Sequence, residues 1–148
     1  MARRYSITGT DTNTAATTML GLTSTAAIRP IVYEIIIGLN SAPADSYAEY
    51  AVQRYTAAGT STAVTPQALD SGDPAATATA GMAHSVEPTY TANAILLQCP
   101  VYSRSTFRWT TFPEFGLKLP ATAANGVGLL VTAVGTAQAI RAVFHFEE

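Results

Sequence analysis

Charge is the property that this 148-residue sequence most clearly lacks. Asp, Glu, Lys and Arg make up 12% of the chain, about half of the roughly 25% found in typical soluble domains. The net charge is −2 and Lys118 is the single lysine, so there is no basic patch to neutralise phosphates, and we expect no nucleic-acid partner. No apolar run approaches the roughly 18 residues of a membrane-spanning helix, so we expect no membrane partner.

Low charge also predicts something about the surface. Charged residues are depleted at the centres of protein–protein interfaces, so a globular chain with few charges is typical of a protein whose surface is covered by partners. A plain domain rich in Ala and Thr is the alternative interpretation.

The sequence has little cysteine. Cys99 is the only one, which excludes an internal disulfide. It lies in the apolar run AILLQCPVY, and this context predicts a buried, inert thiol rather than a nucleophile. The N-terminal sequence MARRYSITGT has no hydrophobic signal core, so we expect synthesis or assembly in a reducing cytoplasm.

Short motifs of catalysis and nucleotide binding are also absent. The sequence has no G-x-S-x-G, G-x-x-x-x-G-K or H-E-x-x-H pattern, each of which carries a known chemistry. His84 and His145 have no Cys, His or Asp at a metal-ligand spacing, and we interpret both as surface or interface histidines. We therefore expect no enzyme, no catalytic residue, no metal and no cofactor; a small hydrolase or isomerase is the least favoured function.

Strand-forming sequence is what the chain does contain, since Thr, Val, Ile, Tyr and Phe favour strands. The C-terminal AIRAVFHFEE alternates so that His145 should face away from Phe144 and Phe146. The strongest strand is IRPIVYEIIIGLN, in which alternation predicts one face of Ile31, Tyr33, Ile35 and Ile37 and another of Val32, Glu34 and Ile36.

About eight to ten such strands, separated by Gly, Pro, Asn and Asp, predict one all-β domain over residues 1–148, a sandwich or a barrel. Both chain ends are strands and should be held in sheets. At most one short helix is expected, as a turn near Pro43–Tyr47, although YAEYAVQRYT alternates equally well as a strand. Pro66 should end a strand or lie in an edge strand.

The stretch DSGDPAATATAGMAHS, which begins at Asp70, is the longest segment without a strand pattern. Asp70 and Asp73 are candidate calcium ligands, but calcium takes six to eight oxygens, and both acids are also typical of Asx turns. A long structureless loop in a compact domain usually has a function. We interpret it as a turn over Asp70–Pro74 followed by an extended arm, too poor in side chains to enter the core, that lies against a neighbouring protein, either another subunit or a larger assembly that carries it.

Aromatic residues leave a further alternative open. They are more often core or interface anchors when they alternate along strands, but together they are also typical of a sugar-stacking platform. The candidates for that platform are Trp109 and the tyrosines at positions 47, 50, 55, 90 and 102.

A resemblance covers most of the chain. The segments RYSITGT, IRPIVYEIIIGLNSAPADSYAEYAVQRYTAAGTSTAVTPQALDSGDPAATATAG, EPTYTANAILLQCPVYSRSTFRW and ATAANGVGLLV resemble small structural proteins of tailed bacteriophages. The likeness is greatest to capsid decoration (cement) proteins, particularly of phages that infect cyanobacteria and other aquatic bacteria. The resemblance implies a jelly-roll-like β-sandwich, assembled as a homotrimer on the capsid exterior of the virion after synthesis in the host cytoplasm. It does not indicate which residues touch the shell.

Together these observations predict a non-enzymatic virion protein, a trimeric cement protein that binds the major capsid protein and stabilises the shell. A receptor- or glycan-binding knob of a phage fibre or head fibre is the alternative. The residues that we assign to the assembly interface are Asp70, Asp73, Pro74, Met82, His84, Tyr90 and Trp109.

Overall fold

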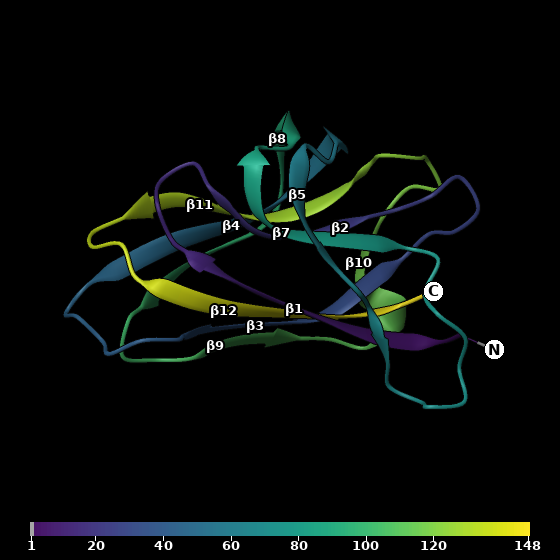
Figure 1. Ribbon diagram of the computed structural model, residues 1–148, viewed down its shortest axis with the longest axis horizontal. Helices are drawn as coiled ribbons and strands as arrows, with labels where there is room; N and C mark the ends of the chain where they lie inside the picture. The colour runs from purple at the N-terminus through teal and green to yellow at the C-terminus, as the bar shows by residue number, and fades with distance from the viewer. Residues whose placement is uncertain (1) are drawn as a thin grey trace.

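A computed structural model describes residues 2–148 and arranges them in two antiparallel sheets (Figure 1). In spatial order, the first sheet contains β10 (Leu117–Lys118), β3 (Ile31–Leu39), β12 (Ala139–Glu147), β1 (Arg4–Thr12) and β6 (Gln67–Ala68), and β9 (Phe107–Thr110) also pairs with β3. The second sheet contains β5 (Thr60–Val64), β7 (Thr79–Val86), β2 (Thr18–Thr23), β11 (Gly126–Val134), β4 (Tyr47–Ala57) and β8 (Thr89–Tyr102). One 3-10 turn, η1, spans Pro113–Phe115.

The strand order is that of a jelly roll. Strand β4 pairs with β8, β3 with β9, β2 with β11 and β1 with β12. Each pair encloses the previous one in the sequence, and successive pairs alternate between the two sheets, which is how a jelly roll wraps one long antiparallel hairpin into a sandwich. The prediction of an all-β, jelly-roll-like sandwich with at most one short helix is confirmed.

The core lies between the sheets, where inward-facing side chains alternate with outward-facing ones. Tyr5 on β1 stacks on Phe146 on β12, with ring centroids 5.4 Å apart. Phe144 and Phe146 are fully buried, whereas His145 is only partly buried on the outer face. The alternation predicted for the last strand is therefore confirmed, and both chain ends are paired with each other, from Arg4 opposite Glu147 onward.

Strand β3 differs from its predicted alternation. The pairing shifts so that His145 lies opposite Glu34 while Phe146 lies opposite Val32, which makes Tyr33 the extra residue of a β-bulge. Because a one-residue shift exchanges the two faces of a strand, Val32 is buried in the core with Ile35. The assignment of Val32 and Glu34 to one face was wrong.

The predicted turn structure is right in two places and wrong in a third. Pro66 separates β5, at the edge of the second sheet, from β6, at the edge of the first, so the strand does break there. No helical turn lies at Pro43–Tyr47, because the alternating pattern prevails and β4 begins at Tyr47. The turn over Asp70–Pro74 is present, since the Asp73 amide donates to the Asp70 carbonyl oxygen at 3.0 Å.

The prediction that the stretch after this turn is an extended arm outside the core was wrong. The second half of this stretch is strand β7, and Ala78 and Ala80 are 2% and 9% exposed and belong to the hydrophobic core. Small side chains fit here because β7 passes close to β1: the Thr10 amide lies 3.3 Å from the Met82 sulfur. A narrow space is filled by alanine, so a lack of bulk does not imply a lack of burial. With β7 and the short β6, residues 2–148 form twelve strands, more than the eight to ten predicted.

Strands β4 and β5 form one side of a long antiparallel ribbon, and β7 and β8 form the other. Pairing continues from Ala57 opposite Thr89 to Thr60 opposite Val86. The ribbon bends sharply at Gly59, whose φ of +71° favours glycine. It arches over the outer face of β2 and β11, and its bend rises above the sandwich at the top of Figure 1.

Candidate functional site

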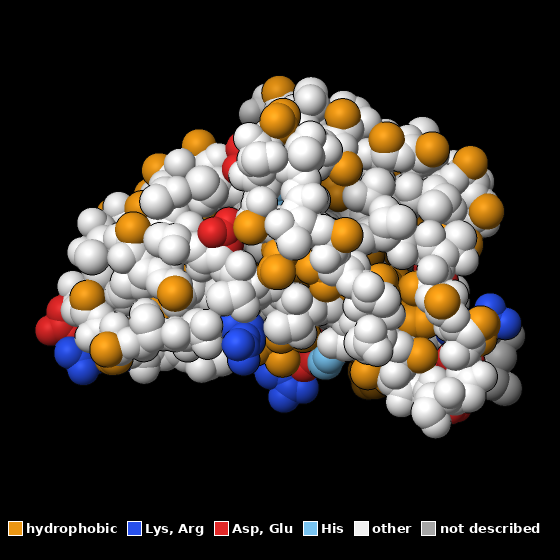
Figure 2. All heavy atoms as spheres, viewed as in Figure 1, with side chains coloured by type: hydrophobic (Ala, Val, Ile, Leu, Met, Phe, Trp, Pro, Cys, Tyr) orange, Lys and Arg blue, Asp and Glu red, His pale blue; other side chains and the backbone are white. Residues whose placement is uncertain are grey.

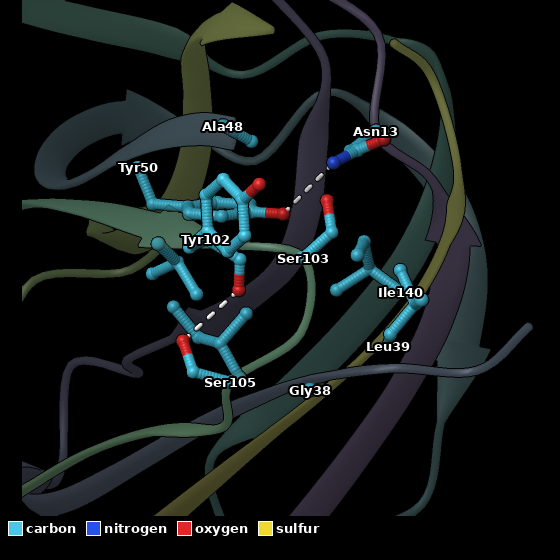
Figure 3. Close-up of a pocket in the computed structure, with 11 residues that line it drawn as sticks. Asn13, Gly38, Leu39, Ala48, Tyr50, Tyr102, Ser103, Ser105 and Ile140 are labelled. Carbon is cyan, nitrogen blue, oxygen red and sulfur yellow. Dashed lines mark hydrogen bonds between the residues drawn. The ribbon is translucent and has the colours of Figure 1, made fainter. Parts of the chain in front are cut away.

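The hollow between the sheets is too small for a substrate. It measures about 10 Å³, room for one water molecule at most, whereas ligand pockets measure about 300–1,000 Å³. Figure 3 shows this cavity, where the Asn13 amide donates to the Tyr50 hydroxyl oxygen at 3.0 Å.

Charged side chains form one compact cluster on the outer face of the first sheet. Glu34 is only 7% exposed, and it accepts a hydrogen bond from Nε of Arg108 while its other oxygen lies 2.5 Å from Nδ1 of His145. Burial alone would raise the pKa of Glu34, but the bonds from His145 and Arg108 outweigh it and lower that pKa below its usual value. Sequence analysis missed the cluster because its members lie on three separate strands.

This cluster has one feature of a hydrolytic site. Ser6 lies directly opposite His145, so Ser6, His145 and Glu34 form a row across β1, β12 and β3, in the order of a catalytic triad. A triad also needs a cleft that binds substrate and donors for an oxyanion, and the hollows of this surface are lined by other residues. We interpret the row as a structural anchor that fastens β9 and β12 to β3.

The first group of predicted interface residues lies beside the chain termini. Asp73 lies 3.9 Å from Arg3, the carbonyl oxygen of Pro74 accepts from the Tyr5 hydroxyl at 3.1 Å, and Oδ1 of Asp70 accepts from the Gly72 amide at 2.9 Å. The contact of Asp70 is that of an Asx turn, and the other two join the turn to the N-terminal segment. Within residues 2–148, no group of three His, Cys, Asp or Glu residues is placed to hold a metal ion.

The second group lies under the bent ribbon. Nδ1 of His84 lies 3.2 Å from the carbonyl oxygen of Thr18, and the Tyr90 hydroxyl lies 2.7 Å from the Thr18 hydroxyl. Met82 packs against the core, as does Trp109, but Trp109 is on β9 at the far edge of the first sheet. The seven residues assigned to an assembly interface thus do not share one surface, and their role stays a prediction.

Buried phenols and the single thiol show how dry the second sheet is. Burial raises the pKa of Tyr55 to about 12, although its hydrogen bond to Thr23 opposes the shift, and it raises the pKa of Tyr90 still further. Cys99 is 8% exposed, and burial together with the nearby Glu49 raises its pKa to about 11. A thiol with so high a pKa is a poor nucleophile, in agreement with the prediction.

Two exposed phenylalanines form the most prominent apolar feature of the surface. Phe112 and Phe115 are 74% and 70% exposed and flank the 3-10 turn η1. Their backbone is fixed, because the Thr111 amide donates to the Tyr33 carbonyl and the Phe115 amide to the Phe112 carbonyl, each at 2.9 Å. The sequence signal was FPEF, two aromatic residues in a turn, where neither can be buried by strand alternation.

The candidate stacking residues divide into buried and exposed sets. Tyr50 and Tyr55 are buried, and Tyr90 and Trp109 are covered as described above. Tyr47 and Tyr102 remain 53% and 49% exposed at the end of the sandwich away from the termini.

Figure 2 shows that basic side chains on this view gather mainly along the lower border, on the side of the first sheet.

Comparison with known proteins gives no relative: no family model, no curated protein and no solved structure matches this chain. Among the helical segments of residues 2–148, none is long and apolar enough to cross a membrane.

Proposed function

We propose that this protein is a structural virion protein, a homotrimeric decoration protein that binds the lattice of the major capsid protein and stabilises the shell. The observation that carries the proposal is the rigidly held, exposed pair Phe112 and Phe115. Exposed apolar groups of this kind mark protein–protein contacts, and aromatic residues are enriched among the residues that dominate binding energy.

The rest of the molecule supports the same function. The hollow between its sheets is far smaller than a ligand, and only 12% of its residues are charged. Covering such a surface with protein costs little, because few charges must lose their water. A jelly-roll sandwich with both chain ends paired in one sheet is a stiff unit, as a clamp on a shell requires.

In a ring of three subunits, each subunit presents one surface and receives a different one, because cyclic contacts are heterologous. We assign Phe112 and Phe115 to the presenting surface. Burying a phenylalanine contributes about 1.5–3 kcal/mol, so the pair supplies a substantial part of the association free energy at each of the subunit contacts.

Light scattering coupled to size-exclusion chromatography tests the trimer. The wild-type chain should have the mass of three subunits, and the double variant Phe112→Ser/Phe115→Ser should elute as a monomer with an unchanged circular dichroism spectrum. Val86→Ser is the matched control, because Val86 is 58% exposed on the ribbon and lies outside the pair. A wild-type monomer at micromolar concentration contradicts the trimer.

Binding to the shell needs a separate measurement. Shells assembled from the major capsid protein of the same genome should carry the wild-type protein down on sedimentation and become more resistant to heat. If the double variant remains trimeric but no longer sediments with shells, the pair contacts the shell rather than a neighbouring subunit. If neither property changes, the pair has no part in assembly.

A further inference from the structure

We propose that the end of the sandwich away from the chain termini binds a neutral carbohydrate. The site consists of a tyrosine platform, formed by Asp45, Tyr47, Tyr102 and Arg104, and the hollow beside it. This proposal is independent of the capsid function, because it concerns the opposite end from Phe112 and Phe115 and needs neither a trimer nor a shell.

The two tyrosines supply exposed aromatic surface. Tyr47 at the start of β4 and Tyr102 at the end of β8 lie directly opposite each other, and each is about half exposed, at 53% and 49%. Gly135 lies on the other side of Tyr47, where a Cβ atom would be 3.7 Å from two ring carbons. Glycine therefore leaves that part of the Tyr47 ring uncovered. The C–H groups on one face of a pyranose are suited to the negative face of such a ring.

Polar groups stand beside the rings in the arrangement that sugar hydroxyls need. Oδ1 of Asp45 accepts from the Tyr102 hydroxyl at 3.3 Å and from Nε of Arg104 at 2.5 Å. The side chains of Asp45 and Arg104 are 71% and 56% exposed, so both face solvent. A carboxylate only accepts and a guanidinium only donates hydrogen bonds, and adjacent sugar hydroxyls can satisfy both at once.

Arg104 also borders a hollow of about 390 Å³, which is within the size range of ligand sites. Ser41, Ser105 and Thr106 line it with hydroxyl groups, and Pro43 adds an apolar wall. A surface that mixes hydroxyls with small apolar patches fits a sugar better than it fits an apolar ligand.

The loops that carry the site are already fixed. The Ser103 amide donates to the Ser46 carbonyl at 2.9 Å, and the Thr136 amide donates to the Ser46 hydroxyl oxygen at 2.7 Å. The Gln138 amide donates to Oδ1 of Asn13 at 2.6 Å, which ties a third loop to the same end. Because the loops need little ordering, binding loses little conformational entropy.

Local charge selects a neutral ligand. Asp45 and Glu49 bring two carboxylates to this end of β4, and Arg104 brings one positive charge. Glu49 lies on the same face as Tyr47, where it accepts from Gln98 at 2.8 Å. Uronic and sialic acids would meet a site with excess negative charge, and like charges repel. The structure therefore points to neutral hexoses.

Titration of the isotope-labelled protein with free neutral sugars, followed by amide chemical shifts, tests the site. Glucose, galactose, mannose, N-acetylglucosamine and their disaccharides form the panel. At least one should shift amides of residues 41–47, 102–106 and 135 and leave the Phe112–Phe115 amides unmoved. Tyr102→Ala should weaken that binding about tenfold, the factor that corresponds to 1.4 kcal/mol. Tyr102→Phe, which keeps the ring but loses the bond to Asp45, should weaken it less.

Val86→Ser is the control, because Val86 is 58% exposed on the ribbon and lies outside both the tyrosine platform and the Phe112–Phe115 pair, and this variant should bind sugar as the wild type does. Amide spectra of each free variant show whether it is folded. The proposal is wrong if no neutral sugar shifts these amides at tens of millimolar, if the shifts lie elsewhere, or if Val86→Ser weakens binding as much as Tyr102→Ala. It is also wrong if glucuronic acid binds as tightly as glucose.

A glycan on a cell surface and a free sugar would bind this site through the same groups, so a second experiment distinguishes the two sources. An array of immobilised neutral polysaccharides should retain the protein if the ligand is a surface glycan, whereas free disaccharides alone should bind if it is soluble. Tyr102→Ala should weaken either signal about tenfold, and a signal that this change leaves at the wild-type level contradicts the assigned site.

Discussion

The outer faces of the two sheets of the sandwich are built on different chemistry. The first sheet turns Glu34, His145 and Arg108 outward in a hydrogen-bonded cluster. The second sheet carries glycines on β11, and the bent ribbon covers them: a Cβ at Gly126 would lie 2.5 Å from the Tyr55 hydroxyl, and one at Gly128 would lie 2.3 Å from the Tyr90 hydroxyl. One face is open and charged, and the other is covered and close-packed.

The contrast shows that a jelly roll can bury both sides of one sheet without a second domain. Strands β5 and β7, which lie between β4 and β8 in the sequence, are responsible, because they extend the second sheet and fold back across it. Glycine on β11 and tyrosine on the ribbon are complementary: the first removes bulk and the second fills the space. The first sheet has no such cover, so its outer residues must be compatible with water.

Replacement of one glycine on each sheet should give the largest difference in unfolding free energy between the two faces. Gly126→Ala should lower the free energy of unfolding by about 3 kcal/mol, because its Cβ would lie 2.2 Å from the carbonyl oxygen of Leu22, which cannot rotate away. Gly38→Ala on the first sheet is the matched control, since its nearest contact would be 3.6 Å, from Thr106. That change should stay within about 1 kcal/mol. Urea unfolding measures both, and equal losses would contradict the difference in packing.

Removal of the carboxylate of the charged cluster should have the next largest effect. Glu34→Gln should cost about 2 kcal/mol near neutral pH, since Glu34 is buried and accepts from two partners. Glu147→Gln breaks the pair with the exposed Arg4 and should cost about 0.5 kcal/mol or less.

The difference in stability between the wild type and Glu34→Gln should change with pH in one direction. Because folding lowers the pKa of Glu34 from its usual 4.5, its stabilising contribution is present above that value and is lost as the pH falls through the folded pKa. The gap between wild type and Glu34→Gln should therefore close in acid. Unfolding at a series of pH values measures it, and a gap that is independent of pH would show that packing, not charge, is responsible.

The smallest effect is expected at the phenols of the covered face. Tyr55→Phe removes the 2.7 Å hydrogen bond with Thr23 and should cost about 1 kcal/mol. Thr23→Val removes the same bond from its other end, and the double variant should cost less than the sum of the two. Additive losses in urea unfolding would mean that the two hydroxyls are not coupled.

Alkaline pH sharpens this test. Tyr55 keeps its proton in the folded state up to a pKa of about 12, against 10 in the unfolded chain, so its contribution is present below pH 10 and is lost as the pH rises through 12. Stability of the wild type should consequently fall more steeply with pH in this window than stability of Tyr55→Phe.

The sequence was sufficient for much of the fold. Alternation in the last strand placed Phe144 inside and His145 outside, and Pro66 marked the break between two edge strands. It was not sufficient for Val32, because a bulge depends on the pairing of two strands far apart in the sequence. It also failed for Ala78 and Ala80, since small residues predict neither exposure nor burial until their neighbours are known.

The candidate sites were less accessible to sequence analysis. Tyr102 was among the aromatic residues considered for stacking, but nothing in the sequence distinguished it from Tyr55, which is buried. The contact of Asp45 with Arg104 joins residues that are 59 positions apart, and Phe112 and Phe115 follow a strand in a turn that has no periodicity.

The sequence by itself determined the class of this protein: strands throughout, few charges, no disulfide and no motif of catalysis, because these properties depend on residue types and on their local order. The tertiary structure decided which of the similar residues are available to partners. It buried Ala78, Ala80, Tyr50 and Tyr55, and it left Tyr47, Tyr102, Phe112 and Phe115 exposed. Burial depends on contacts between distant segments, so only the folded chain assigns it.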